Sequence, residues 1–201
     1  MSRRTAILIA VLALAAMRDT HAASLQAQVR DASGKPLADA VVYAMPGAAV
    51  PELRRGKAAV EQIDREFVPY VTVVQTGTLV AFPNRDPILH HVYSFSPAKP
   101  FEIKLYTGKS PTEVLLDKPG VITLGCNIHD WMIGYILVVS TPHFAKTDAT
   151  GHALLRDLPA GAYDIHAWHP QQRSSAAAQR VTLDAAARKV KYKPPLDRLK
   201  Y

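Results

Sequence analysis

The segment from Gly125 to Met132 reads Gly-Cys-Asn-Ile-His-Asp-Trp-Met, and it decides which fold and which chemistry we expect. A thiol, an imidazole and a thioether recur in it at a spacing of three residues, in Cys126, His129 and Met132. Two imidazoles and one thiolate, with a weakly bound Met sulfur, form the ligand set of blue copper sites. The segment therefore predicts a copper site and supplies three of its four ligands. The alternative is a buried free cysteine with unrelated neighbours.

The fourth ligand is expected upstream, in residues 84–92, which read Asn-Arg-Asp-Pro-Ile-Leu-His-His-Val. This segment contains two adjacent histidines, His90 and His91. Successive side chains of a strand point to opposite faces, so only one of the two can face a given site. The residues alone leave the choice between them open.

Residues 1–22 have the composition of a secretory signal peptide. Met-Ser-Arg-Arg is followed by an apolar run over residues 5–17 and by Thr-His-Ala at residues 20–22. A basic start, a short apolar segment and a small residue before the cut are typical of such signals. We therefore expect export to the periplasm, with an N-terminal membrane anchor as the alternative; the apolar run is too short to span a bilayer as a helix. An unpaired cysteine in an oxidising compartment needs an explanation, and metal ligation supplies one.

The chain is basic, with 24 Lys and Arg against 17 Asp and Glu and a formal net charge of +7. Much of the excess lies in residues 188–193 and in a basic tail, residues 194–201. No basic motif is interleaved with aromatic residues, so nucleic acid is not an expected partner. No Ser-His-Asp or paired-carboxylate constellation has a supporting context, so we expect no enzyme. His166 and His169 are expected to be solvated residues at the end of a strand rather than a second metal site.

The sequence predicts an all-β fold. Fifteen prolines, many turns that contain glycine and short β-branched runs favour strands over helices. The clearest predicted strands are residues 71–74, 79–82, 91–95, 121–124 and 135–139. Only residues 184–188 and 50–55 have helical character.

Two distant segments share the pattern Asp-Ala-(Ser/Thr)-Gly, at residues 31–34 and 148–151. Aspartate and glycine in these places predict tight turns. With Leu-Pro-Ala-Gly-Ala-Tyr at residues 158–163 and strands at 40–44 and 180–183, they resemble the carboxypeptidase regulatory-like (transthyretin-like, CNA-B-like) β-sandwich family. The resemblance implies one small sandwich built from residues 23–50 and 143–193, split by an inserted domain. The alternative is two unrelated hairpins that flank a single larger sandwich.

Residues 58–141 resemble the cupredoxin family of plastocyanin- and amicyanin-like blue copper proteins, of the kind often labelled methylamine utilization protein. The resemblance rests on Val-Thr-Val-Val-Gln-Thr-Gly-Thr-Leu-Val at residues 71–80, Phe-Pro-Asn at 82–84, Lys-Pro-Gly at 118–120 and the Cys-x-x-His-x-x-Met loop. It implies a Greek-key β-sandwich that binds one type 1 copper through His90, Cys126, His129 and Met132. It also implies that Asn84 and Asn127 link the two ligand loops by hydrogen bonds.

Two features depart from the family pattern. Leu124 stands two residues before Cys126, where an aromatic residue is usual. Asp130 follows His129 directly, and a bond between them would orient that imidazole and lower the copper potential.

The same loop also predicts a contact surface for a partner. By resemblance His129 is the solvent-facing imidazole through which the electron leaves. We expect an apolar docking patch around it, formed by Ile128, Trp131 and Tyr135. A plain packing role is the alternative for Trp131.

The sequence thus predicts an exported carrier of single electrons between periplasmic redox partners, such as a cytochrome c or a quinoprotein dehydrogenase. The first alternative is a periplasmic copper-binding, delivery or sensing protein, because thiolate and thioether also suit Cu(I). The second is a metal-free adhesion or ligand-binding module with Trp131, Tyr135 and Trp168 as an aromatic surface.

Overall fold

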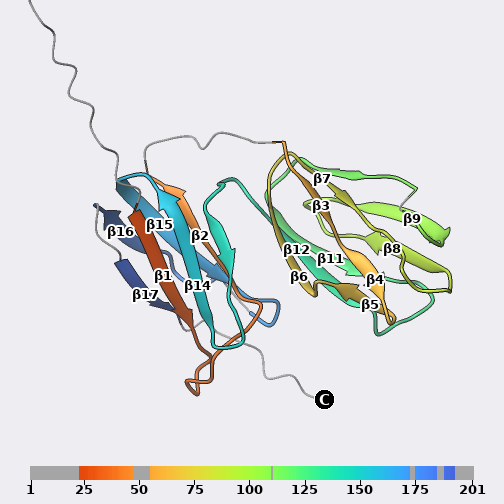
Figure 1. Ribbon diagram of the computed structural model, residues 1–201, viewed down its shortest axis with the longest axis horizontal. Helices are drawn as coiled ribbons and strands as arrows, with labels where there is room; N and C mark the ends of the chain where they lie inside the picture. Colours follow the sequence, from red (N-terminus) through yellow and green to blue (C-terminus); the bar gives the residue numbers. More distant parts are fainter. Residues whose placement is uncertain (1–22, 48–54, 110, 173–174, 185–187, 193–201) are drawn as a thin grey trace, which may run out of the picture.

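The structure is a computed structural model that describes residues 23–47, 55–109, 111–172, 175–184 and 188–192. All regular secondary structure within these residues is β, and the strands form five sheets. The predicted all-β fold is therefore confirmed. Figure 1 shows that the strands gather into two groups, which we name the terminal sandwich (β1, β2 and β13 to β17) and the central sandwich (β3 to β12).

The terminal sandwich is built from both ends of the described chain. Its strands are β1 (Ala23–Val29), β2 (Val41–Pro46), β13 (Phe144–Lys146), β14 (His152–Leu158), β15 (Gly161–Trp168), β16 (Gln179–Leu183) and β17 (Arg188–Tyr192). They form one sheet in the order β14-β1-β17 and another in the order β13-β2-β15-β16. Strands before residue 47 therefore pair with strands after residue 143.

The two sheets of the terminal sandwich share a core of alternating residues. Leu25 on β1, Leu155 on β14 and Ile165 on β15 are at most 2% exposed. Tyr163 and Ile165 both point inwards, as the period of two predicts.

The two Asp-Ala-(Ser/Thr)-Gly segments form tight turns, as the sequence predicts. Gly34 donates its N–H to the carbonyl of Asp31 at 3.0 Å, and Gly151 donates to Asp148 at 2.9 Å. Both glycines are left-handed, with φ of +91° and +76°. The turns are joined, because Val29 donates its N–H to the carbonyl of Gly151 at 2.8 Å.

The central sandwich carries the predicted ligands. Its strands are β3 (Lys57–Ala59), β4 (Glu61–Ile63), β5 (Glu66–Val68), β6 (Val71–Gln75), β7 (Thr78–Ala81), β8 (His90–Ser94), β9 (Phe101–Tyr106), β10 (Val114–Leu116), β11 (Gly120–Gly125) and β12 (Ile133–Val139). They form sheets in the orders β10-β7-β3 and β6-β12-β11-β8-β9, and β4 and β5 form a hairpin. All five strands expected from the sequence are present, with ends that shift by at most two residues.

Strand β12 is buried on both faces. Ile136 and Val138 belong to the core of the central sandwich. Leu137 and Val139 point the other way, into a second apolar cluster that includes Val41 of the terminal sandwich. A strand buried on both sides accounts for the nearly continuous apolar run of its sequence.

Tyr135 belongs to this contact between the sandwiches. Its ring lies 6.1 Å from that of Trp168 and 5.4 Å from that of Tyr70. Our expectation that Tyr135 contributes to a docking patch beside His129 is wrong, because β12 turns its side chain towards the terminal sandwich.

Several of the predictions made from the sequence concern residues that lie outside the described ranges or at their edges. The signal peptide (1–22), the tail (194–201) and residues 50–54 and 185–187 of the helical expectations lie outside the described residues. Arg188, the last residue of the second expected helix, instead begins strand β17, which pairs in parallel with β1, so residues 188–192 of the basic run join a sheet. No described helix is long and apolar enough to cross a membrane.

The two turn glycines provide a matched stability test. A Cβ on Gly151 would lie 2.4 Å from the carbonyl oxygen of Val29, whereas a Cβ on Gly34 would meet nothing within 4 Å. Gly34→Ala should cost about 1–2 kcal/mol, since only the left-handed backbone is penalised. Gly151→Ala should cost about 1–3 kcal/mol more because of the clash. Urea denaturation followed by circular dichroism measures both; equal losses would contradict the close approach of the two turns.

Candidate metal centre

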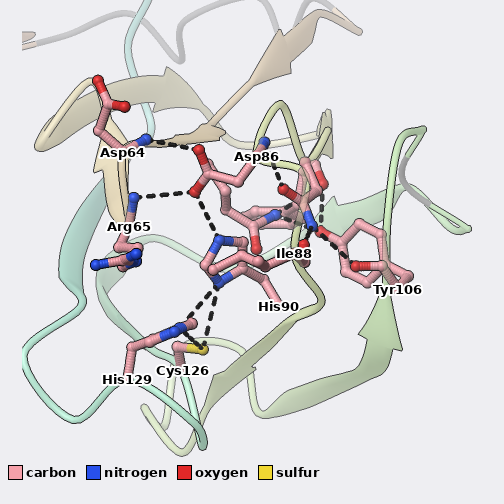
Figure 2. A network of polar contacts seen from close by, with 11 residues as sticks. Asp64, Arg65, Asp86, Ile88, His90, Tyr106, Cys126 and His129 are labelled. Atoms are coloured by element: carbon pink, nitrogen blue, oxygen red, sulfur yellow. Dashed lines mark hydrogen bonds and ion pairs between the residues drawn. The ribbon is translucent and has the colours of Figure 1, made fainter.

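The loops at one end of the central sandwich bring three of the predicted ligands together. β11 and β12 are antiparallel neighbours, so Cys126 follows one strand directly and Met132 immediately precedes the other. β8 lies on the other side of β11 and begins with His90. Figure 2 shows His90, Cys126 and His129 turned towards one another.

Three donor atoms lie close enough to share one metal ion. His90 Nδ1 and His129 Nδ1 are 3.1 Å apart, and Cys126 Sγ lies 3.9 Å and 3.8 Å from them. A metal held in a trigonal plane, with bonds as in zinc sites of about 2.0–2.1 Å to nitrogen and about 2.3 Å to sulfur, separates its donors by about 3.5–3.8 Å. The two nitrogen–sulfur separations agree with this range, and the set fits one metal if the two imidazole nitrogens, 3.1 Å apart, move slightly further from each other. Within the described residues it is the one group of three or more His, Cys, Asp or Glu side chains with this closeness.

Most side chains of the site are buried, and His129 is more accessible to solvent than the others. His90, Cys126 and Met132 are 0%, 3% and 2% exposed, whereas His129 is half-buried. Met132 belongs to the same apolar core as Cys126 and donates its N–H to the carbonyl of His129 at 2.9 Å, which closes the loop as a turn. The role of Met132 as the fourth ligand stays a prediction.

The adjacent His91 faces away from the group. Its Nε2 lies 3.0 Å from Oε1 of Glu102 on the neighbouring strand β9. It is also buried, but on the opposite face of β8 from His90, where its ring is 5.8 Å from that of Tyr93. Strand alternation thus places His90, and not His91, beside Cys126.

A carboxylate that the sequence did not single out contacts the site. Asp86 Oδ2 lies 2.7 Å from His90 Nε2, on the side of the ring away from the donor cluster. The same carboxylate accepts the N–H groups of Asp64 at 2.7 Å and Arg65 at 2.9 Å. Asp130, which the sequence suggested for such a role on His129, is exposed. No local pattern in the sequence signals this contact, because a spacing of four residues brings side chains together on a helix, and this segment is a loop.

Asn84 has a different role from the one expected. Its Nδ2 donates to the carbonyls of Ile88 at 2.7 Å and Tyr106 at 2.9 Å, and its Oδ1 accepts the N–H of Asp86 at 2.9 Å. Both amide hydrogens are therefore used within its own loop and on β9. The expected link from Asn84 to Asn127 is not made; Asn84 instead stabilises the segment that carries Asp86.

The electrostatics of the group favour an ionised Asp86 and a neutral His129. Burial acts to raise the pKa of Asp86, but hydrogen bonds from the Arg65 N–H, the His90 ring and the Asp64 N–H outweigh it and hold the pKa below its usual value. Burial and the nearby His90 and Arg65 lower the pKa of His129, against the opposing effect of Asp86. A neutral imidazole has a lone pair available for a metal.

Apolar side chains surround the open edge of the site. Trp131 is 64% exposed and Ile128 is 47% exposed. The Trp131 ring lies 5.4 Å from that of His129. The loop therefore presents a small aromatic and aliphatic surface beside the most accessible of the three donors.

Two histidines near the end of β15, His166 and His169, differ from expectation. His169 is 7% exposed, and its burial lowers its pKa. His166 is partly buried and stacks on Tyr43, with ring centroids 4.9 Å apart. The prediction that both are solvated is therefore wrong, because His169 is buried directly after the end of β15 and the Tyr43 ring of β2 covers one face of His166.

Comparisons with known proteins give only distant matches. No family model matches this chain, and no curated protein matches it. Among solved structures, a purple cupredoxin from Nitrosopumilus maritimus is 20% identical over 41% of this chain and 99% of its own, with a TM-score of 0.37. A reduced mutant form of amicyanin is 17% identical over 48% and 99%, with a TM-score of 0.39. A copper-containing nitrite reductase from Thermus scotoductus is 24% identical over 47% of this chain and 25% of its own, with a TM-score of 0.40.

The two adjacent histidines allow a matched test of the ligand assignment. His90→Ala should weaken Cu(II) binding strongly, because it removes one of three donors that lie within 3.9 Å of one another. His91→Ala should leave binding nearly unchanged, because that ring faces Glu102. Isothermal titration with Cu(II) in competition with a chelator measures both. The reverse order of effects would show that the upstream ligand is His91.

Proposed function

We propose that this chain is an exported type 1 copper protein that carries single electrons. The observation that carries the proposal is the convergence of His90 Nδ1, His129 Nδ1 and Cys126 Sγ within 3.9 Å at one end of a β-sandwich. Two imidazoles and one thiolate in a trigonal arrangement, with a distant Met sulfur, are typical of this type of copper site. Met132, buried in the same core as Cys126, is the residue that would supply the fourth, weak donor.

The protein around the donors is suited to electron transfer. Copper bound there would exchange one electron between Cu(I) and Cu(II). Rapid exchange requires ligands that keep their positions in both states. His90 is fully buried and held by Asp86, and Cys126 sits at the end of β11 in the apolar core. His129, half-buried beside exposed Trp131, is the proposed exit for the electron.

The proposed family follows from the same residues. The central sandwich resembles cupredoxins in its strand order along the sequence and in the Cys-x-x-His-x-x-Met loop. The terminal sandwich resembles the carboxypeptidase regulatory-like family in its paired turns. Residues 1–22 read as a signal peptide, which supports a periplasmic location.

A redox protein such as a cytochrome c or a quinoprotein dehydrogenase is the proposed partner. Trp131 and Ile128 offer an apolar contact beside His129, and Asp130 is exposed in the same loop. Electron-transfer encounters have small interfaces and are short-lived. An apolar contact of two exposed side chains beside His129 suits such an encounter, and we propose no enzymatic reaction for the chain itself.

The alternative is a periplasmic protein that binds, delivers or senses copper without electron transfer. The soft donors Cys126 and Met132 favour it, since thiolate and thioether select Cu(I). Under this alternative the site would hold Cu(I) and release it to a partner, and oxidation to Cu(II) would be slow or destructive.

The visible spectrum tests the proposed site. Addition of Cu(II) to the exported protein should give an intense thiolate-to-copper charge-transfer band with 1:1 stoichiometry. Cys126→Ser should abolish the band, while Ser96→Ala, a change in a different loop, should keep it. A wild-type protein that binds Cu(II) without an intense band would contradict a type 1 site.

Reversibility then separates the carrier from the alternative. Voltammetry of the copper-loaded protein should show a single reversible one-electron wave that persists over repeated cycles. Loss of copper or of the wave after oxidation would favour delivery or sensing.

A further inference from the structure

We propose that Asp86 is a positioning residue that fixes the orientation and the tautomer of His90, so that Nδ1 faces the metal position. This inference rests on the proposed copper site, but it concerns the protein's own side chains. It assigns a function to a carboxylate that lies on another loop than Cys126 and His129. Asp86 would act through His90 and would not touch the metal.

The two nitrogens of the His90 ring have opposite surroundings. Nε2 lies 2.7 Å from the Asp86 carboxylate, whereas Nδ1 lies 3.1 Å from His129 Nδ1 and 3.9 Å from Cys126 Sγ. An ionised carboxylate only accepts hydrogen bonds, so Nε2 must carry the proton. With that proton on Nε2, the nitrogen left to offer a lone pair to a metal is Nδ1, which is the atom that points at the other two donors.

Asp86 is itself held on several sides. Asp64 and Arg65 donate their N–H groups to its two oxygens at 2.7 Å and 2.9 Å. These two residues form the turn between β4 and β5, and both have left-handed φ, +53° and +61°. Positive φ at both central residues defines the two-residue hairpin turn of type I′. The hairpin thus presents two adjacent amides to one carboxylate.

The segment that carries Asp86 is fixed from the other direction as well. Asn84 accepts the N–H of Asp86 and donates to the carbonyls of Ile88 and Tyr106. Figure 2 shows this continuous set of contacts, which runs from the hairpin turn through Asp86 to His90 and on to Cys126 and His129. His90 is completely buried, so bulk water cannot replace the carboxylate as the acceptor for its ring N–H.

The contact has two consequences for a bound metal. A carboxylate that accepts from the far nitrogen makes the imidazole a stronger donor and restricts its rotation. Its negative charge also favours Cu(II) over Cu(I). Loss of the carboxylate should therefore weaken Cu(II) binding and raise the reduction potential.

The first test needs no metal. Nitrogen-15 NMR of the histidine rings in the metal-free wild-type protein should show His90 with its proton on Nε2 and a slowly exchanging ring N–H. In Asp86→Asn, which has nearly the same shape, the side chain cannot accept from His90 and from both hairpin amides as a carboxylate does. The slowly exchanging signal should be lost or the tautomers should mix. A wild-type His90 with its proton on Nδ1 would overturn the inference, whatever the variants do.

The second test uses copper and a variant with the same change of charge. Glu61→Gln removes a carboxylate on strand β4. In the wild type this carboxylate pairs, at 2.6 Å, with Arg85, the residue that precedes Asp86. Asp86→Asn should lower Cu(II) affinity by about 10–100-fold and raise the potential, while Glu61→Gln should leave both close to wild type. If the two variants behave alike, the effect of Asp86→Asn is that of any lost negative charge nearby, and the inference fails. If the wild type gives no thiolate-to-copper band, the proposed function fails, and the metal-free NMR result still decides the role of Asp86.

Discussion

The pairing of β11 with β12 and β8 is the constraint on which the site depends. Gly125, the last residue of β11, pairs with Ile133 on one side and Tyr93 on the other. A Cβ on Gly125 would lie 2.6 Å from the Tyr93 ring, so this ring occupies the space that a side chain would need. A slip of one residue in either direction would turn every side chain of the strand to the other face and would bring Leu124 or Cys126 against that ring. The register is therefore fixed one residue before Cys126, which sets the direction in which the Cys126 side chain points.

The second half of the site is held by a different part of the chain. His90 begins β8, but the direction of its ring depends on Asp86 and, through it, on the hairpin turn at Asp64 and Arg65. The ligand loop and the hairpin belong to different sheets of the central sandwich. The ligand loop and the hairpin therefore hold the donor atoms independently of each other. Support of this kind keeps the ligands of a metal site in place in the absence of the metal. The open side of the group is His129, whose lowered pKa keeps it neutral over a wider range of pH.

Local sequence patterns predicted the strands. Strand alternation, which relates neighbouring residues, showed that only one of His90 and His91 could face the site. Asp86 lies in the same segment, but its contact depends on a hairpin more than twenty residues earlier, which no local pattern reveals. Asn84 was expected to link two loops; the amide has only two hydrogens, and nearer carbonyls take both. Tyr135 was misassigned for the same reason: only the packing of two sandwiches shows that its face of β12 is covered. The sequence therefore predicted the strands correctly but did not predict the contacts between segments that are distant along the chain.

The central claim is that one copper is bound by His90 Nδ1, His129 Nδ1 and Cys126 Sγ. X-ray absorption at the copper edge of the fully loaded protein tests it most directly, in both oxidation states. The account predicts one short copper–sulfur bond and two copper–imidazole bonds whose lengths change little between Cu(I) and Cu(II). Absence of the short copper–sulfur bond, or loss of an imidazole on reduction, would contradict the account.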